Sequence, residues 1–275
     1  MKSLILVAAI VVITLVPLAG ASTQPMPAHA SFAIDSAALH ETRHINVYTP
    51  PGYATDTAAR YPVLYMPDGG LDEDFPHVAA DVDAAILAGE MRAMIVVGIE
   101  NTERRRDMTG PTEVDSDHKI APHVGGSGAF RAFIADELMP EVRRRYRTNG
   151  KTAIVGESLA GLFVLETFFM QPRLFDTYVA LSPSLWWNHE KLVRDAASRL
   201  QAWPRGLQKT LYFATTGDDG LEAAAKSLRA SLRANAPRQL TWFYEPWPDL
   251  HHSDIYRRAS PRVFRKLFGG KKLGH

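Results

Sequence analysis

The chain has 275 residues, of which 31 are Lys or Arg and 30 are Asp or Glu, so its formal net charge is +1. This near balance gives no indication of a nucleic-acid-binding surface. The sequence contains no cysteine, which excludes disulfide bonds, thiolate metal sites and a lipid-modified N-terminal cysteine. The length that remains after removal of a leader suits one large α/β domain.

The first residues have the pattern of a targeting signal. Lys2 precedes an almost wholly apolar stretch over residues 4–18, which is short for a membrane span. Ala19-Gly20-Ala21 then offers a small-x-small cleavage site, and Ala28-His29-Ala30 offers a second. We therefore expect a signal peptide over residues 1–21, with cleavage as late as residue 30 as the alternative, and no stable membrane span afterwards. Export without disulfides fits a bacterial periplasm or secretion.

Strand and helix patterns alternate along the rest of the chain. Continuous apolar runs predict strands buried on both faces, and apolar residues at helical spacing predict helices. Such alternation indicates a mostly parallel central sheet with helices on both faces, in a single domain over residues 31–270. In chain order, the predicted strands are 45–48, 62–66, 94–99, 152–158, 178–181, 211–214 and 240–244, and the predicted helices are 75–90, 130–146 with a kink at Pro140, 159–170, 221–232 and a terminal helix containing 263–268.

The segment from Gly156 to Gly161, with sequence GESLAG, joins a predicted strand to a predicted helix. A sharp strand-to-helix turn exposes a serine hydroxyl over the sheet edge and points the first helical amides at the same place. Small residues are needed at the flanks because the backbone folds back on itself. The pattern predicts Ser158 as a nucleophile; the alternative is a buried serine in an ordinary turn.

A base for this serine is expected after the last strand. In α/β-hydrolases, the chain order is serine, acid, histidine. The strand 240–244 is followed by a loop that contains His251 and His252, and either histidine fits that position. For a histidine pair the alternatives are simple solvation or weak metal binding.

An acid that orients the base is expected after the strand 211–214. Asp218 follows Gly217 directly and is expected to be used by the turn. Glu222 falls in the first helical turn, where the helix dipole alone explains a carboxylate. We therefore choose Asp219, with Glu222 second.

Two backbone amides are candidates for an oxyanion hole. Asp68-Gly69-Gly70 follows the predicted strand 62–66, and its glycines allow an amide to face the serine. The amides of Gly70 and Leu159 would then hold the developing negative charge, at about 3 kcal/mol per donor.

At this point the chain resembles the putative-esterase family of α/β-hydrolases, which includes esterase D and enterobactin-type siderophore esterases. The likeness rests on YPVLYMPDG at 61–69, VGIEN at 97–101 leading to Arg104, Arg106 and Asp107, GESLAGLF at 156–163, SPSLWW at 182–187 and HSDIY at 252–256. The resemblance implies an α/β-hydrolase fold and a metal-free serine hydrolase with no cofactor. Registering the family's H-x-[ST]-x-Tyr pattern on Tyr256 implies His252 rather than His251 as the base. Pro67 and Ala160 depart from the family pattern.

We expect a serine esterase that acts on a small-molecule ester, either a siderophore ester or a short acyl or aryl ester. Trp186 and Trp187 are expected to line the acyl or aryl pocket, with core packing as the alternative. Arg106, like Arg104, is a candidate to bind an anionic substrate, but pairing with Asp107 to fix the loop after the strand 94–99 is the slightly favoured interpretation. Residues 105–128 are a candidate small lid. The alternative function is an acyltransferase or a non-hydrolytic binding protein on the same fold.

Overall fold

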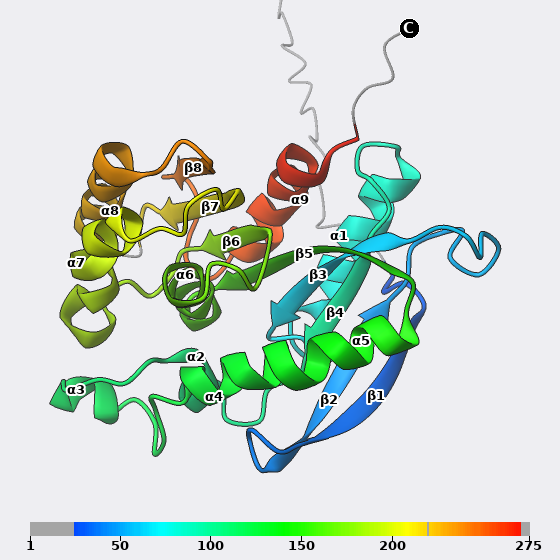
Figure 1. The fold of residues 1–275 in the computed structure, drawn as a ribbon, viewed down its shortest axis with the longest axis horizontal. Helices are drawn as coiled ribbons and strands as arrows, with labels where there is room; N and C mark the ends of the chain where they lie inside the picture. Colours follow the sequence, from blue (N-terminus) through cyan, green and yellow to red (C-terminus); the bar gives the residue numbers. More distant parts are fainter. Residues whose placement is uncertain (1–24, 219, 271–275) are drawn as a thin grey trace, which may run out of the picture.

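The computed structural model describes residues 25–218 and 220–270. Its eight-stranded sheet has the order β1-β2-β4-β3-β5-β6-β7-β8 (Figure 1). β2 is antiparallel to both β1 and β4, and all other neighbours are parallel. The strands are β1 His29–Ser36, β2 Glu41–Tyr48, β3 Tyr61–Pro67, β4 Ile95–Ile99, β5 Thr148–Glu157, β6 Thr177–Leu181, β7 Lys209–Thr216 and β8 Leu240–Trp247.

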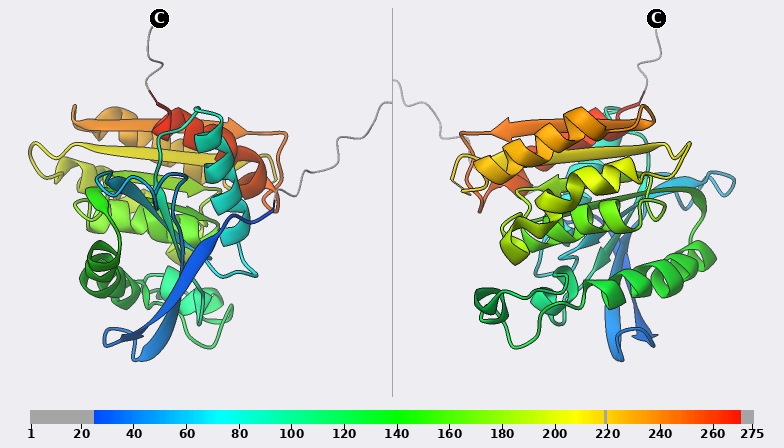
Figure 2. Two further views of the ribbon diagram at one scale, coloured as in Figure 1. Left: turned by 90° about the vertical axis from the view of Figure 1, so that its right-hand side faces the viewer. Right: turned by 60° about the vertical axis from the view of Figure 1, so that its left-hand side comes forward.

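Helices cover both faces of this sheet, as the alternating pattern predicts. One apolar core lies under α1 and α9, and the other lies under the helices from α4 to α8. Figure 2 shows α1 and α9 together on one side of the strands. The helices are α1 Phe75–Leu87, α2 Arg104–Met108, α3 Asp115–His118, α4 Ser127–Ala132, the π-helix η1 Phe133–Leu138, α5 Met139–Arg145, α6 Leu159–Met170, α7 Trp187–Gln201, α8 Glu222–Asn235 and α9 Ile255–Phe268.

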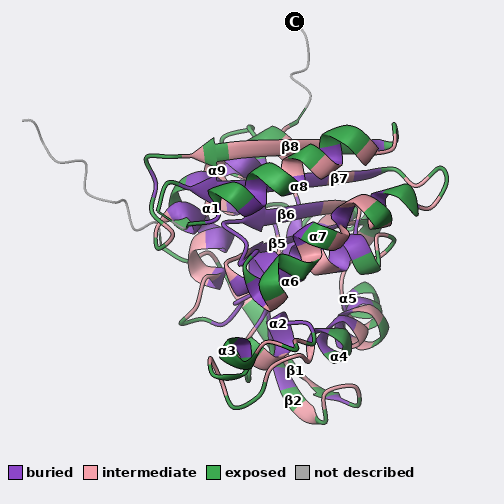
Figure 3. Ribbon diagram, turned by 90° about the vertical axis from the view of Figure 1, so that its left-hand side faces the viewer, coloured by how far each residue is buried: buried purple, intermediate pink, exposed green. Residues whose placement is uncertain are grey.

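The central strands are the most buried part of the molecule (Figure 3). β4 is buried at every residue, which explains why its sequence is a continuous apolar run without alternation. β1 lies at a sheet edge and alternates between exposed and half-buried residues. Its sequence, HASFAIDS, contains no continuous apolar run, so the pattern did not predict this strand. Cleavage after Ala30 would remove the first two residues of β1, whereas cleavage after Ala21 would leave the strand whole; residues 1–24 lie outside the described part of the chain.

The predicted helix over 130–146 is divided into α4, η1 and α5. Pro140 follows the π-helical turn directly and stands in the first turn of α5. Proline has no amide hydrogen to donate, so a widened turn before it accommodates the lost hydrogen bond without a break. The sequence analysis also missed α7, whose first turn contains left-handed backbone at Asn188, His189 and Glu190.

In the described part of the chain, no helix is both long and apolar enough to cross a membrane.

A buried ion pair attaches α2 to the antiparallel side of the sheet. The guanidinium of Arg43 on β2 lies 2.6 Å from the carboxylate of Asp107, and both side chains are fully buried. Arg43 also donates to Thr102 and to the carbonyl of Glu100, and its guanidinium lies over Phe130. These contacts fix α2 at the carboxyl ends of β3 and β4.

Asp107→Ala should destabilise the fold strongly, because the buried Arg43 charge loses its fully buried partner and keeps only the part-exposed Glu41, 2.9 Å away, as a carboxylate partner among the described residues. We expect a loss of about 3–5 kcal/mol in the free energy of unfolding, measured by urea denaturation. The control is Glu103→Ala, which breaks a solvent-exposed pair with Arg106 and should cost less than about 1 kcal/mol. Equal effects of the two substitutions would contradict this account of α2.

Candidate active site

Ser158 stands at a strained turn between β5 and α6. Its backbone has φ 59° and ψ −120°, in the half of conformational space that non-glycine residues rarely occupy. The Ser158 amide donates to the carbonyl of Leu181, and its own carbonyl accepts from the amides of Leu162 and Ser184. The turn is therefore held from β6 and from α6 at once, and it presents the hydroxyl at the carboxyl end of the sheet.

The flanks of this turn explain the small residues in the motif. A Cβ atom on Gly156 would lie 2.6 Å from the carbonyl carbon of Ala160, and one on Gly161 would lie 3.1 Å from the carbonyl oxygen of Leu181. Glycine is therefore required at 156 and favoured at 161. Ala160 is fully buried, and its own Cβ points at Gly156, so its methyl group fits only because residue 156 has no side chain.

His252 lies against this serine. It comes from the loop between β8 and α9, and its Nε2 is 3.1 Å from the Ser158 hydroxyl oxygen. His251 points elsewhere: its side chain is 70% exposed, and its Nδ1 lies 2.9 Å from Asp218. The structure thus brings one histidine of the pair, His252, into reach of the serine.

The other ring nitrogen of His252 contacts a residue that the sequence analysis did not single out for a role. Its Nδ1 lies 2.8 Å from the hydroxyl of Ser182, which follows β6 directly and is fully buried. Ser184, two residues on, has its hydroxyl 3.4 Å from that of Ser158. Both serines belong to the SPSLWW segment, and a position directly after a parallel strand was the signal that could have identified them.

The Asp218 carboxylate holds the loop that carries His251 and His252. Its Oδ1 accepts from the His252 amide at 2.9 Å, and its Oδ2 pairs with His251. These hydrogen bonds lower the pKa of Asp218 below its usual range, the one with the His251 side chain contributing most. The preferred acid, Asp219, lies outside the described residues, and Glu222 is the first residue of α8.

The two proposed oxyanion donors have different surroundings. Leu159 is the first residue of α6, where an amide has no acceptor within its own helix, and it lines the cleft at Ser158. The Gly70 amide, in contrast, donates to the carboxylate of Glu73 at 2.7 Å. In the structure the Gly70 amide is occupied by Glu73, and this part of the predicted oxyanion hole requires correction. The glycine at 69 has a packing role, since a Cβ there would lie 2.1 Å from the Ile99 nitrogen.

An open cleft of about 500 Å³ leads to the Ser158 hydroxyl. It combines cationic, aromatic and aliphatic side chains with the serine and histidine. Its lining residues are Arg104, Arg105, Ile120, Ser158, Leu159, Ser184, Trp186, Asp218, Leu221 and His252. Arg105 and Ile120 belong to the segment that the sequence analysis treated as a small lid.

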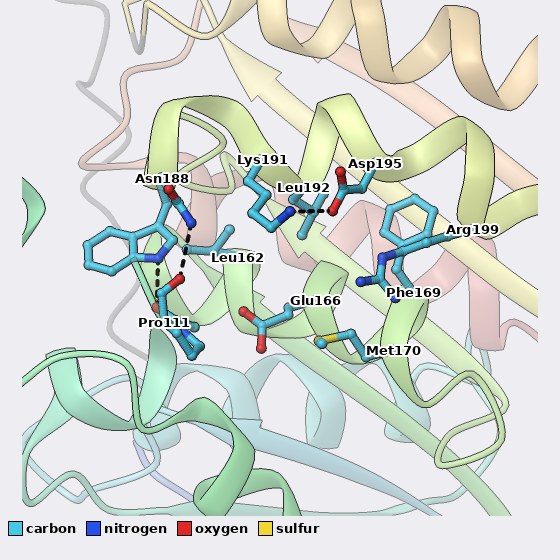
Figure 4. Close-up of a pocket in the computed structure, with 12 residues that line it drawn as sticks. Pro111, Leu162, Glu166, Phe169, Met170, Asn188, Lys191, Leu192, Asp195 and Arg199 are labelled. Atoms are coloured by element: carbon cyan, nitrogen blue, oxygen red, sulfur yellow. Dashed lines mark hydrogen bonds and ion pairs between the residues drawn. The ribbon is translucent and has the colours of Figure 1, made fainter. Parts of the chain in front are cut away.

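The two tryptophans separate into one surface residue and one core residue. Trp186 is 43% exposed and lines the cleft. Trp187 is buried, and its indole nitrogen donates to the carbonyl of Gly110 at 2.9 Å. Trp187 instead lines a second cavity of about 110 Å³ between α6 and α7, drawn in Figure 4, whose lining includes neither Ser158 nor His252. The expectation that both rings line one acyl pocket is therefore wrong for Trp187, because its ring fills the core.

Arg106 forms the expected pair with Asp107, and its assignment to substrate binding requires correction. Arg106 does not line the Ser158 cleft; its guanidinium pairs with Glu41 at 2.8 Å and with Asp107 at 2.7 Å. These partners raise its pKa, the hydrogen bond with Glu41 most of all. Arg104 lines the cleft but is held by both oxygens of Asp68. Arg105, which the sequence analysis passed over, is exposed and lines the cleft.

Comparisons with known proteins agree with this geometry. A family model described as putative esterase matches residues 36–241. Ferri-bacillibactin esterase BesA of Bacillus subtilis is 33% identical over 163 residues, which are 54% of this chain and 56% of that protein, so the match spans about half of its length. Apo-salmochelin esterase of Escherichia coli O6:H1 is 27% identical over 83% of this chain and 76% of that protein. An IroE-like serine hydrolase from Shewanella oneidensis superposes with a TM-score of 0.80 and 27% identity, over 88% of this chain and 80% of that one.

Replacement of the two histidines tests the placement of the base. His252→Ala should lower turnover of an activated ester by about 10³-fold or more, because the serine loses its proton acceptor. His251→Ala, the matched control, should cost less than about tenfold, since it removes only one contact of the loop. The measurement is the initial rate with a p-nitrophenyl ester, together with circular dichroism to check folding. The reverse ranking would assign the base to His251.

Proposed function

The chain belongs to the putative-esterase family, and we propose that it is a serine esterase that cleaves carboxylic esters through an acyl-enzyme on Ser158. The observation that carries this proposal is the 3.1 Å contact between the Ser158 hydroxyl and Nε2 of His252, at a turn that exposes that hydroxyl in a cleft. A nucleophile within hydrogen-bond reach of a base is the minimal requirement for acyl transfer.

The mechanism follows from these positions. Nε2 of His252 takes the Ser158 proton as the oxygen attacks the ester carbonyl, and the resulting imidazolium gives that proton to the leaving alcohol oxygen. The Leu159 amide, at the N-terminus of α6, donates to the oxyanion. A water molecule then attacks the acyl-enzyme, again with His252 as the base, and the acid product leaves.

The carboxylate that orients His252 is proposed to be Asp219. In the sequence, Asp219 stands between Asp218, whose oxygens accept hydrogen bonds from the histidine loop, and Glu222, which is in the first turn of α8. The Ser182 hydroxyl, 2.8 Å from Nδ1, is proposed to share in this orientation. Asp219→Asn should then lower turnover, up to about 10⁴-fold where orientation dominates.

The proposed substrate is a siderophore ester or another ester with an anionic or aromatic acyl group. Two of the similar proteins are, by name, a ferri-bacillibactin esterase and an apo-salmochelin esterase. The cleft supports this class because Arg105 supplies an exposed cation and Trp186 an exposed aromatic face close to the nucleophile. We further propose that residues 1–21 direct export to the periplasm or the medium, where such esters are encountered.

Ser158→Ala is the decisive test of the nucleophile. Removal of the hydroxyl should abolish hydrolysis of p-nitrophenyl esters and of a triscatecholate trilactone, by about 10³-fold or more, without unfolding the protein. A variant that keeps more than about a tenth of the activity would overturn the assignment. Product analysis with an added alcohol separates hydrolysis from acyl transfer, since a transferase would form a new ester in place of the free acid.

Arg105→Gln tests the anionic substrate class. The substitution should raise KM for an anionic aryl ester by about tenfold and leave a neutral ester of the same size unchanged, because only the charge contact is lost. Arg258→Gln is the matched control, since Arg258 is an exposed arginine of α9 that pairs with Asp254 and is absent from the cleft lining. Equal losses for both esters would mean that Arg105 does not recognise charge.

A further inference from the structure

The mechanism leaves unused a carboxyl group that faces the base nitrogen. Glu157 is the last residue of β5 and precedes Ser158 directly. Its Oε1 lies 3.2 Å from Nε2 of His252, the same nitrogen that lies 3.1 Å from the Ser158 hydroxyl. The nucleophile and Glu157 therefore compete for one ring nitrogen.

The surroundings of Glu157 favour its neutral form. Its side chain is only 16% exposed, and Oε1 accepts no hydrogen bond from the described residues. The charge of Arg104 acts on Glu157, but the Nε and Nη2 atoms of this guanidinium donate to Asp68 at 2.6 and 2.9 Å. The charged and titratable groups that face Glu157 from the neighbouring elements are Arg104 of α2, Asp68 after β3, Asp74 before α1, Tyr256 of α9 and His252.

We propose that Glu157 is a positioning residue for the esterase reaction, which holds a proton while the enzyme works and disables His252 when it loses that proton. The proposal rests on the proposed serine-esterase function. With its proton on Oε2, the neutral carboxyl presents Oε1 to Nε2 as a carbonyl oxygen that cannot donate, so Nε2 keeps its lone pair for the Ser158 proton. An ionised carboxylate at the same distance would favour a proton on Nε2, where it blocks the base.

The protons balance in this switch. Glu157 releases one proton to solvent, and the neutral imidazole keeps its single ring proton, which moves from Nδ1 to Nε2.

The direction of the pH dependence follows from the burial of Glu157. Burial raises the pKa of Glu157 to about 8; Arg104 opposes the rise, and repulsion by Asp68 and Asp74 adds to it. Glu157 is thus mostly protonated at neutral pH, and activity should fall as the pH rises through about 8.

Glu157→Gln mimics the protonated carboxyl and removes its titration. At pH 7 the variant should keep kcat/KM within about threefold of the wild type, and at about pH 9.5 it should exceed the wild type by about 30-fold, because the alkaline fall is gone. Asp74→Asn should move the fall to lower pH in the otherwise wild-type enzyme, since one repulsive charge is removed. Glu90→Gln, at an exposed pair with Arg265, is the control and should keep the wild-type profile.

An ionised Glu157 that assists catalysis would give the opposite result. Glu157→Gln would then lose about 100-fold or more at pH 7. That loss, or an alkaline fall that persists in the variant, would overturn the proposal.

A second measurement does not depend on ester turnover. The ¹⁵N shifts of the His252 ring report which nitrogen carries the proton. Above about pH 8 the wild type should shift toward the Nε2-protonated tautomer, and Glu157→Gln should not. Identical His252 titrations in both proteins would refute the role of Glu157. The serine-esterase proposal would instead be refuted if the protein showed no ester turnover and a fluorophosphonate failed to label Ser158. The ¹⁵N shifts of the His252 ring would then still test the role of Glu157.

Discussion

The left-handed backbone of Ser158 is the constraint on which the rest of the site depends. Such a conformation costs on the order of 1–3 kcal/mol and persists only where neighbouring structure enforces it. Two features enforce it here. Hydrogen bonds with Leu181 and Leu162 fix the turn at both ends, and the close approach of Ala160 to Gly156 prevents the backbone from relaxing. The strain places the hydroxyl outside the sheet and leaves the Leu159 amide directed at the same point.

The three consecutive arginines of α2 show how one helical turn serves different purposes. Successive helical residues point about 100° apart, so neighbours in sequence cannot share a partner. Arg104 binds Asp68 after β3, Arg105 reaches the cleft, and Arg106 joins Glu41 and Asp107 in the network that includes Arg43. The buried network holds α2 in place. Arg105, the exposed arginine, is therefore not needed for packing and can contact a ligand.

The central strands, the elbow and the order of serine and histidine were predictable because each depends on local pattern. Buried apolar runs identify parallel strands, and small residues around Ser158 identify a tight turn. What failed depends on contacts that form only in the folded chain. Nothing in SLWW distinguishes Trp187, which reaches the carbonyl of Gly110, from Trp186, and nothing in RRRD assigns one arginine to Glu41. The Gly70 amide is engaged by a glutamate three residues on, a contact that only the folded loop reveals.

Parallel pairing explains why so few residues suffice to build this site. β5, β6 and β7 are neighbours in one sheet and end at the same edge, with Glu157 beside Leu181 and Leu181 beside Ala214. The next residues along each strand end are therefore Ser158, Ser182 and the loop carrying Asp218, and His252 contacts all three. The same pairing brings Glu157 to the base. The Glu157 carboxyl, at the end of the strand that precedes the nucleophile, therefore lies next to His252. It is compatible with catalysis only while burial keeps it protonated.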